Sequence, residues 1–201
     1  MTITYEYKNH LYLNITNRCQ NRCVFCIREG AKGIGGYDLW LEEEPSAEEV
    51  IEAIGDAGTY DEIVFCGFGE PLTRIEVVKE VCRRLKDTYA VPIRINTNGL
   101  ANLVHGRNIL PELAGLVDII SISLNGASSE EYQRISRPKI GEDSYQEVLN
   151  FITEAKEHIP RVITSVVDYP GVDVEGARRK SEELGVEFRV RSYQRKLEDS
   201  K

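Results

Sequence analysis

The stretch Cys19-Gln20-Asn21-Arg22-Cys23-Val24-Phe25-Cys26 organises the rest of the chain, because it sets three thiols at C-x3-C-x2-C spacing. An alternating apolar run, residues 11–15, precedes it and predicts a strand that ends in a ligand loop. Thiolates are soft ligands that select zinc, copper(I) or iron–sulfur clusters. Structural zinc takes four protein ligands, whereas a cubane [4Fe–4S] cluster held by three cysteines has one open iron. An open iron is a place where a substrate or a cofactor can bind.

The composition is ordinary for a globular protein with an acidic balance. The chain has 201 residues, of which 41% are hydrophobic, and its net charge is −8, which argues against broad nucleic-acid binding. No apolar run approaches the roughly 20 residues that a membrane span needs, and residues 1–8 lack a secretory pattern. Five cysteines are an odd number and three of them are clustered, which disfavours a disulfide framework. We therefore expect a cytoplasmic protein without a membrane segment.

Short β-branched segments alternate with amphipathic segments along the chain. Strands are expected at residues 11–16, 62–66, 92–97, 118–124, 161–167 and 186–193. Helices are expected at residues 46–57, 74–87, 111–116, 128–135, 145–158 and 174–184. This alternation predicts right-handed βαβ units and a parallel sheet. We expect a single domain over residues 1–201, with its core at about 8–193 and a frayed tail at 194–201.

Glycines and polar residues gather where the expected strands end. They lie at residues 19–26, 67–71, 96–99, 123–126 and 167–168. Folds built from βαβ units place their chemistry at the carboxyl ends of the strands, so these segments should meet in one site. Residues 28–44 form a Gly-rich loop that is long for a connection of this kind. It is either a lid over that site or a surface loop pinned by Trp40 and Leu41.

The cysteine spacing, with Phe25 directly before the last cysteine, resembles the cluster loop of radical S-adenosylmethionine (SAM) enzymes. The resemblance implies an α/β fold, a partial (β/α)6 TIM-like barrel with parallel strands that is open on one side. It also implies that Cys19, Cys23 and Cys26 hold a [4Fe–4S] cluster whose open iron chelates SAM. One electron from the cluster then cleaves SAM to methionine and a 5′-deoxyadenosyl radical, which abstracts hydrogen from a substrate. Phe25 is carried over as a residue beside the cofactor.

Gly67-Phe68-Gly69-Glu70-Pro71 follows the second expected strand. By itself the segment predicts a glycine turn and a proline that starts a helix. It also resembles the Gly-Gly-Glu-Pro motif of radical SAM proteins, whose exposed backbone receives the amino group of SAM. Phe68, Gly69 and Glu70 are therefore carried over as cofactor contacts. Phe68 stands where the family more often has its first glycine, which puts the geometry of the turn in question.

The third expected strand ends in Asn96-Thr97-Asn98-Gly99. Asn-Gly is a common turn signal, but polar residues at the end of a buried strand also need hydrogen-bond partners. Asn96 and Asn98 share one face by strand alternation. The resemblance implies that this segment lies beside the methionine moiety and the ribose of SAM, through Asn96, Asn98 and, more weakly, Thr97.

Ser121, Ser123 and Asn125 share one face of the fourth expected strand. Polar residues on an inward face predict a polar cavity in place of a filled core; the alternative is that they are ordinary hydrogen-bonded strand residues. The resemblance places Ser123 and Asn125 at the ribose and carboxylate of SAM. It also places the backbone of Val167, at the end of the fifth expected strand, near the adenine.

Arg189, Arg191 and Tyr193 share one face of the last expected strand. Facing inward, the arginines would suit an anionic group such as the SAM carboxylate or a substrate acid; facing outward, they would be solvated. The inward orientation is favoured for Arg191. Cys66 as a fourth cluster ligand would block the open iron, so a packed strand residue is expected. Cys82 lies on the apolar stripe of a helix and is expected to be a buried hydrophobe.

Residues 36–41, the Phe-Gly-Glu-Pro turn, Arg137-Pro138 and the compact length are most similar to the TatD-associated radical SAM proteins. That branch implies no particular substrate. The chain has no further cysteine cluster, so a second iron–sulfur site is not expected. Little sequence follows the last expected strand, so a large substrate-recognition domain is not expected either.

Three functions stay open on the sequence. The first is hydrogen abstraction by a radical SAM enzyme, with a flavodoxin- or ferredoxin-type electron donor. The second is activation of a glycyl-radical partner. The third is a non-catalytic module that binds zinc or an iron–sulfur cluster, with Cys66 or a histidine as a further ligand. The substrate is unknown: a macromolecule, a partner protein or a second copy of the chain would close the open side of the barrel, and a small molecule would fit under the Gly-rich loop.

Overall fold

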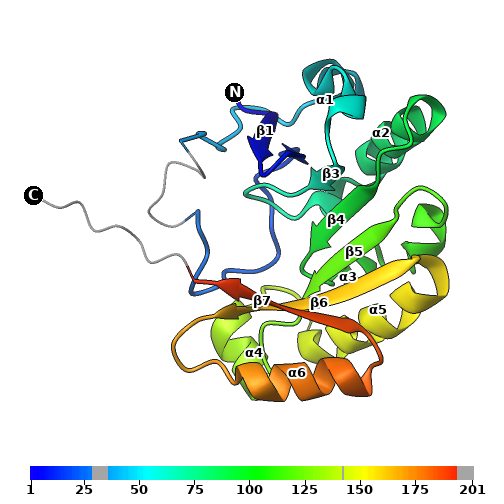
Figure 1. The fold of residues 1–201 in the computed structure, drawn as a ribbon. Coiled ribbons are helices and arrows are strands. Elements are labelled where there is room, and N and C mark those ends of the chain that lie inside the picture. Colours follow the sequence, from blue (N-terminus) through cyan, green and yellow to red (C-terminus); the bar gives the residue numbers. More distant parts are fainter. Residues whose placement is uncertain (29–35, 142, 194–201) are drawn as a thin grey trace, which may run out of the picture.

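The computed structural model describes residues 1–28, 36–141 and 143–193. One seven-stranded sheet runs through it, and its strands follow chain order. The strands are β1 (Thr4–Tyr7), β2 (His10–Leu13), β3 (Glu62–Phe65), β4 (Ile93–Thr97), β5 (Ile119–Ser123), β6 (Arg161–Asp168) and β7 (Glu187–Ser192). β1 pairs with β2 antiparallel, and every later pair is parallel. The sheet curves around an open side that lies between its two edge strands, β1 and β7 (Figure 1).

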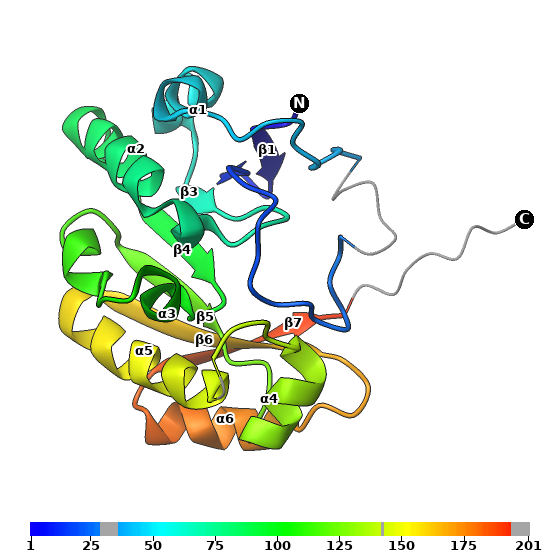
Figure 2. The ribbon, with the colours of Figure 1, turned by 180° about the vertical axis from the view of Figure 1, so that it is seen from behind.

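Helices connect the parallel strands and cover the outer face of the sheet (Figures 1 and 2). The α-helices are α1 (Ala47–Ile54), α2 (Ile75–Thr88), α3 (Ala101–His105), α4 (Ser129–Ser136), α5 (Ser144–His158) and α6 (Val174–Glu183). The 3-10 helices are η1 (Ala57–Thr59), η2 (Pro71–Arg74) and η3 (Leu110–Leu113). None of the helices in the described part of the chain has the length and apolar character that a membrane span requires.

Side chains alternate between the two faces of each strand, and the two faces differ in polarity. Those that face the helices, such as Phe65, Ile95 and Ile122, are apolar and fully buried, and each contributes about 1.5–3 kcal/mol by leaving water. On the inner, concave face, Asn96 of β4 lies opposite Ser121 of β5. The hydrophobic core therefore lies between the strands and the helices, and the inside of the curved sheet is left polar.

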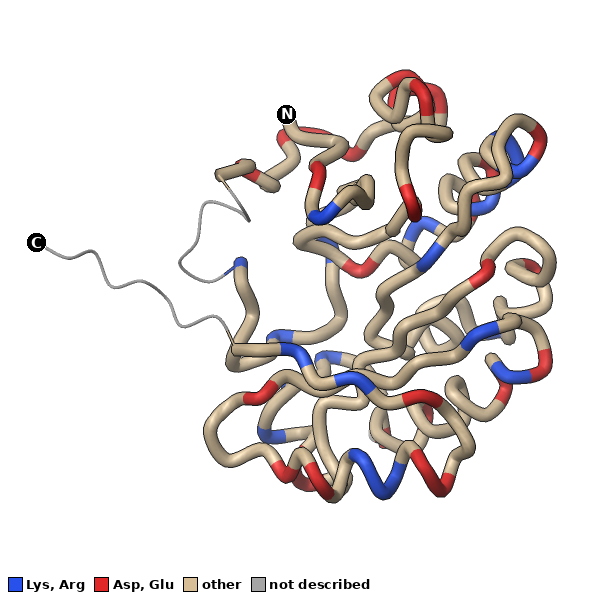
Figure 3. Tube along the Cα trace, viewed as in Figure 1, with Lys and Arg blue, Asp and Glu red and all other residues tan. Residues whose placement is uncertain are grey.

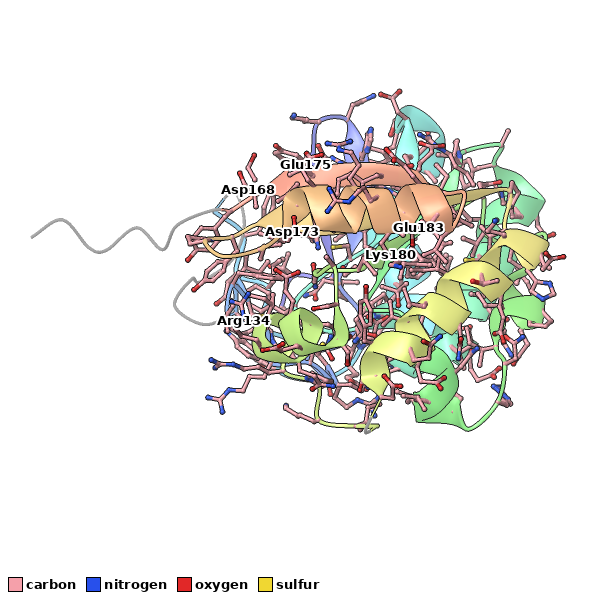
Figure 4. The ribbon with its side chains drawn as sticks, turned by 90° about the horizontal axis from the view of Figure 1, so that it is seen from below. Arg134, Asp168, Asp173, Glu175, Lys180 and Glu183 are labelled. Atoms are coloured by element: carbon pink, nitrogen blue, oxygen red, sulfur yellow. The ribbon has the colours of Figure 1, made fainter. Side chains whose placement is uncertain are left out.

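Caps and ion pairs fix the helical layer, where acidic and basic positions are interspersed (Figure 3). On α6, Lys180 pairs with Glu183 at 2.6 Å, and Asp173 caps the start of the helix (Figure 4). Arg134 of α4 donates a hydrogen bond of 2.6 Å to the carbonyl of Gly171. This bond ties the loop that follows β6 to α4, so the carboxyl ends of two neighbouring strands are held together.

The partial barrel of parallel strands, open on one side, is confirmed, and the six expected strands are β2 to β7. Sequence reasoning misses β1, which forms a hairpin with β2. Lys8 and Asn9 make the two-residue turn with φ values of +50° and +59°. Turns of this kind usually contain glycine, so the sequence carries no signal for this one.

The helices differ from the expected ones in three places. α1 ends at Ile54 and not near residue 57, because Gly55 takes a φ of +63° and stops the helix. The sequence does not predict α3, which has five residues and is too short for a clear helical period. The helix expected at 111–116 is the shorter η3. The tail expected at 194–201 lies outside the described residues.

Ser46 begins α1 with a capping box, in which its hydroxyl accepts from the N–H of Glu49 (3.2 Å) and the Glu49 carboxylate accepts from the N–H of Ser46 (2.7 Å). We expect Ser46→Ala to lower the free energy of unfolding by about 1 kcal/mol, because a helix N–H group loses its partner. Urea denaturation measures the change. The control is Glu52→Ala on the exposed side of the same helix, which should change it by less than about 0.5 kcal/mol. Equal effects would contradict the capping role.

Candidate cluster and cofactor site

The loop with the three cysteines crosses the carboxyl ends of the strands, from the end of β2 toward β7 (Figures 1 and 2). Backbone hydrogen bonds join it to the end of α4. The N–H of Arg22 donates to the carbonyl of Ser136 (3.1 Å), and the N–H of Val24 donates to that of Ile135 (2.9 Å). The cysteine loop is therefore fixed by residues that lie more than a hundred positions later in the chain.

The thiols of Cys19 and Cys26 lie near that of Cys23, and all five cysteines of the chain are free. Burial raises the pKa of Cys23 to about 12, and its neighbours Cys19 and Cys26 raise it too, whereas Arg191 and Ser136 lower it. Burial also raises the pKa of Cys19. Thiols with raised pKa values are protonated at neutral pH, so binding of iron must release protons.

The donor set fits a [4Fe–4S] cluster. Three thiolates on such a cluster each bind a different iron, so they need not converge on one ion. A structural zinc site needs four ligands around one ion, and within the described part of the chain no three His, Cys, Asp or Glu side chains are arranged to hold a single metal ion. Cys19, Cys23 and Cys26 would hold the cluster, which supplies an electron and an open coordination position when bound.

The glycine turn after β3 lies against the start of the cysteine loop. A Cβ atom on Gly69 would be 2.3 Å from the carbonyl oxygen of Thr16 and 2.7 Å from that of Arg18, so only glycine fits. The N–H of Glu70 donates to the same carbonyl of Arg18 (2.8 Å). Packing alone therefore requires glycine at position 69, independently of any contact between its backbone and a cofactor.

The carboxylate of Glu70 is buried and joins the ends of β3 and β4. It accepts hydrogen bonds from the N–H of Leu72 (3.2 Å), the hydroxyl of Thr97 (2.8 Å) and the N–H of Asn98 (2.6 Å). Burial raises the pKa of Glu70 to about 7, against these three hydrogen bonds, which lower it. The side chains of Glu70 and Thr97 bind each other and so hold the ends of β3 and β4 together.

Asn98 and Asn96 contact different parts of the site. The amide nitrogen of Asn98 is 3.8 Å from the sulfur of Cys19 and 3.4 Å from the side-chain oxygen of Gln20, so Asn98 reaches the cysteine loop directly. Asn96 lines a cavity inside the sheet, and its buried side-chain oxygen has no hydrogen-bond partner in the described part of the chain.

Phe68 takes the place of a glycine without backbone strain, since its φ is not positive. Its side chain is 4% exposed and packs with Tyr5 and Leu39. It also meets the ring of Trp40 edge-on, with 5.2 Å between centroids. The N–H of Phe68 donates to the side-chain oxygen of Asn14 (3.3 Å). The departure from the Gly-Gly-Glu-Pro pattern is thus accommodated by an aromatic cluster outside the turn.

The described end of the Gly-rich loop, residues 36–44, packs on this cluster. Leu39 and Leu41 are buried, whereas Trp40 is 47% exposed, so the leucines pin the loop more than Trp40 does. Asparagine side chains that follow β2 donate to the carbonyls of both leucines (2.8 and 2.7 Å). Residues 29–35 lie outside the described residues, and a lid function stays a prediction.

A cavity of about 120 Å³ lies on the concave face of the sheet. It is lined by Tyr12, Arg94, Asn96, Ser121, Ser123, Ser165, Arg189 and Arg191. The inward-facing Arg191 donates from Nη2 to the hydroxyl of Ser123 (3.2 Å). Burial lowers the pKa of Arg191, whereas Cys66 and Cys23 raise it, so its guanidinium lies near both thiols. The polar cavity expected from the alternation on β5 is therefore present, and it borders the cysteine loop.

Asn125 and Val167 lie at the ends of β5 and β6 but do not line this cavity. The amide nitrogen of Asn125 is 3.4 Å from the hydroxyl of Ser136, which lies beside the thiol of Cys23. Val167 is buried, and its carbonyl accepts from the N–H of Tyr169 (2.7 Å). The cofactor contacts expected for Asn125 and Val167 stay predictions.

Phe25 begins a row of aromatic side chains that ends at β7. Its ring centroid is 6.0 Å from that of Tyr169, which meets Tyr193 edge-on at 4.9 Å. The row joins the cysteine loop to the ends of β6 and β7. Of the two other cysteines, Cys82 is fully buried, as expected. Cys66 directly follows β3, and its carbonyl accepts from the hydroxyl of Tyr5 (3.1 Å).

Sequence reasoning misses the residues that support the site from behind. Ser136 lies beside the central thiol, and the fully buried Tyr132 accepts a hydrogen bond from Asn21 (3.3 Å). Tyr12 and Arg94 line the cavity. No short-range pattern relates α4 to the cysteine loop. The inward direction of Tyr12 and Arg94 follows from alternation, but only the pairing of the strands brings them together.

These features define an α/β protein with three thiols on one loop beside a polar cavity. The model of the radical SAM superfamily matches residues 13–179. The chain belongs to the radical SAM superfamily, whose members use a [4Fe–4S] cluster and SAM.

Curated relatives include GTP 3′,8-cyclases. The probable GTP 3′,8-cyclase of Thermococcus kodakarensis is 29% identical over 164 residues, 82% of this chain and 49% of that protein. The GTP 3′,8-cyclase of Peptoclostridium acidaminophilum is 32% identical over 149 residues, 74% of this chain and 42% of that protein. The chain therefore spans about half the length of the curated relatives that it matches.

The fold is also similar to that of a radical SAM methyltransferase from Sphaerobacter thermophilus. The TM-score is 0.57 at 18% identity, and the match covers 94% of this chain and 68% of the other. This similarity supports the fold alone. The narrower similarity to the TatD-associated branch stays a prediction.

The close approach at Gly69 predicts a strong effect of a single methyl group. We expect Gly69→Ala to lower the free energy of unfolding by about 2–3 kcal/mol, because the backbone of the cysteine loop must move away. The control is Gly106→Ala, where φ is +63° and no atom lies within 4 Å of the added Cβ; strain there should cost about 1 kcal/mol. Urea denaturation compares the two variants, and equal losses would contradict the close approach.

The three hydrogen bonds to Glu70 predict a second effect. In Glu70→Gln an amide NH2 replaces one accepting oxygen, so at least one buried donor loses its partner. We expect the free energy of unfolding to fall by about 1–3 kcal/mol. Thermal and urea denaturation measure this. Glu130→Gln, at an exposed position of α4, should stay within about 0.5 kcal/mol of the wild type. A Glu70→Gln chain as stable as this control would show that the carboxylate does not join the strands.

Proposed function

We propose that this chain cleaves SAM reductively to methionine and a 5′-deoxyadenosyl radical, which abstracts hydrogen from a substrate. The observation that carries the proposal is the placement of Cys19, Cys23 and Cys26. Their loop borders a polar cavity at the carboxyl ends of parallel strands, where folds of this kind place their chemistry. The thiols supply the cluster ligands, and the cavity gives a reactive species a place that is partly shielded from solvent.

The residues at the strand ends would bind and orient SAM. The proposed contacts are Phe25, Phe68, Gly69, Glu70, Asn96, Thr97, Asn98, Ser123, Asn125, Val167 and Arg191. Two of them stand out on geometry: the amide of Asn98 approaches Cys19, and the guanidinium of Arg191 lies near Cys23. Glu70 and Thr97 would act by holding the ends of β3 and β4 in place, since their side chains bind each other.

The substrate is the open part of the proposal. Relatives of this chain are named as GTP 3′,8-cyclases, so GTP is the first substrate to test. The matched segments cover less than half of those proteins. Cyclisation of GTP is therefore one form of the proposal, and hydrogen abstraction from another substrate is the other.

The reaction needs one electron for each cleavage. We propose that a flavodoxin- or ferredoxin-type protein delivers it, and that the enzyme works in the cytoplasm, where free thiols persist. The support is that all five cysteines are free and that the cluster loop lies at the rim of the barrel.

Reconstitution without oxygen tests the proposal. We expect the wild-type chain to bind about four irons and, with SAM and dithionite, to form 5′-deoxyadenosine. Cys23→Ala should lose both iron and product, because one cluster ligand is missing. The matched control is Cys82→Ala, which removes a buried thiol from α2 and should keep both. Iron is measured by chemical analysis and 5′-deoxyadenosine by chromatography.

A chain that binds one zinc and no iron would overturn the proposal and support a metal-binding module. Addition of GTP separates the two forms of the proposal. Consumption of GTP together with SAM would support cyclisation. Formation of 5′-deoxyadenosine with GTP unchanged would reject GTP and leave hydrogen abstraction from another substrate.

A further inference from the structure

The cavity inside the sheet has an excess of positive charge. Arg94 faces it but is paired with Glu62 at 2.8 Å. Arg189 and Arg191 also face it, and neither has a carboxylate partner in the described part of the chain. The acid on the same face of β7, Glu187, is already paired at 2.7 Å with an arginine of β6. Figure 3 shows basic positions along β7 at the open side of the barrel.

Several buried polar atoms around this cavity have no hydrogen-bond partner in the described part of the chain. They are Nε of Arg94, Nε of Arg191 and the side-chain oxygen of Asn96. Arg94 is only 6% exposed, so its free donor cannot turn into bulk solvent. Buried donors without partners are rare in folded proteins. Two guanidinium donors at one cavity therefore point to a bound acceptor that carries negative charge.

One end of the cavity borders the cysteine loop, at Arg191, and the other end lies farther along β7, at Arg189. Arg189 lies opposite Ser165, and Arg191 lies opposite Val167 at the strand end. Two residues along a strand correspond to about 7 Å, so Arg189, which is exposed, lies that much farther from the end of β7 than Arg191. A cofactor held at the cysteine loop meets Arg191 first. Arg189 and Arg94 are left for a second ligand.

The volume of the cavity limits how much of this second ligand can enter it. A volume of about 120 Å³ is the space of about four water molecules. It accommodates a carboxylate or a phosphate with a few neighbouring atoms. The serine hydroxyls around it, from Ser121, Ser123 and Ser165, add neutral groups that hydrogen-bond to such an anion.

We propose that this cavity binds an anionic group of the substrate, so that the substrate is a carboxylic acid or a phosphate ester whose charged end is held by Arg189 and Arg94. The inference rests on the proposed function, because it takes the ligand of the cavity to be the hydrogen donor. The charged end lies inside the sheet, and the rest of the molecule extends toward the cysteine loop.

Calorimetric titration of the reconstituted, SAM-loaded protein at low salt tests this proposal. Pyrophosphate is the probe for phosphates and malonate the probe for carboxylates. We expect at least one of them to bind with one site per chain, and Arg189→Gln to weaken that binding about 10-fold or more. Arg189→Lys keeps the charge and should recover part of it. The matched control is Arg178→Gln, since Arg178 stacks on Phe188 on the opposite face of β7 and should leave the affinity unchanged.

Three outcomes would overturn the proposal: neither probe binds, Arg189→Gln binds as tightly as the wild type, or SAM and the probe compete for one site. Competition would assign the arginines to the cofactor. Formation of 5′-deoxyadenosine by the wild type is measured separately. A chain that binds the probe but never cleaves SAM would reject the proposed function and keep the anion site. A chain that cleaves SAM but binds neither probe would reject the anion site alone.

Discussion

The contact between Gly69 and the start of the cysteine loop is the constraint on which the rest of the site depends. The carbonyl oxygens of Thr16 and Arg18 lie where a side chain of residue 69 would begin. The hydrogen bond from the N–H of Glu70 to Arg18 closes the same contact. With the turn fixed, the carboxylate of Glu70 reaches Thr97 and Asn98 and sets the end of β4 beside the cysteine loop. One close approach of two backbones thus positions three segments that are distant in sequence.

The two faces of the sheet differ in polarity, so the core and the cavity lie on opposite sides of the strands. Apolar side chains such as Ile95 and Ile122 pack outward against helices and stabilise the fold. The inner face is thereby free to carry asparagine, serine and arginine, which would weaken an ordinary core. β1 and β7 are the two edges of this sheet and are not paired with each other (Figure 1). Because the hydrophobic core lies between the sheet and the helices, residues on the inner face can be substituted without disrupting the core.

Membership in the radical SAM superfamily and the geometry of the site support one another. The family accounts for three cysteines on one loop, and the structure supplies reasons for residues that the family pattern leaves unexplained. Phe68 fits in place of a glycine because its side chain packs with Leu39 and Trp40. Ser136 supports the loop from the end of α4, through its carbonyl and beside the thiol of Cys23. Relatives that match this chain over about half of their own length need not share a substrate, because Arg189 lines the cavity and does not belong to the cysteine loop.

By itself, the sequence determined the loop of three cysteines, the order of the six parallel strands and the inward face of β5, because each is encoded in short-range spacing or alternation. The sequence also favoured an inward orientation for the side chain of Arg191. The hairpin turn at Lys8 and Asn9 gave no sequence signal, since neither residue is the glycine that such turns usually contain. Only the tertiary structure decided that Ser136 lies beside Cys23 and that Arg94 shares a cavity with Arg189. Those neighbours are set by strand pairing and helix packing between distant segments, and no local pattern records which segments will meet.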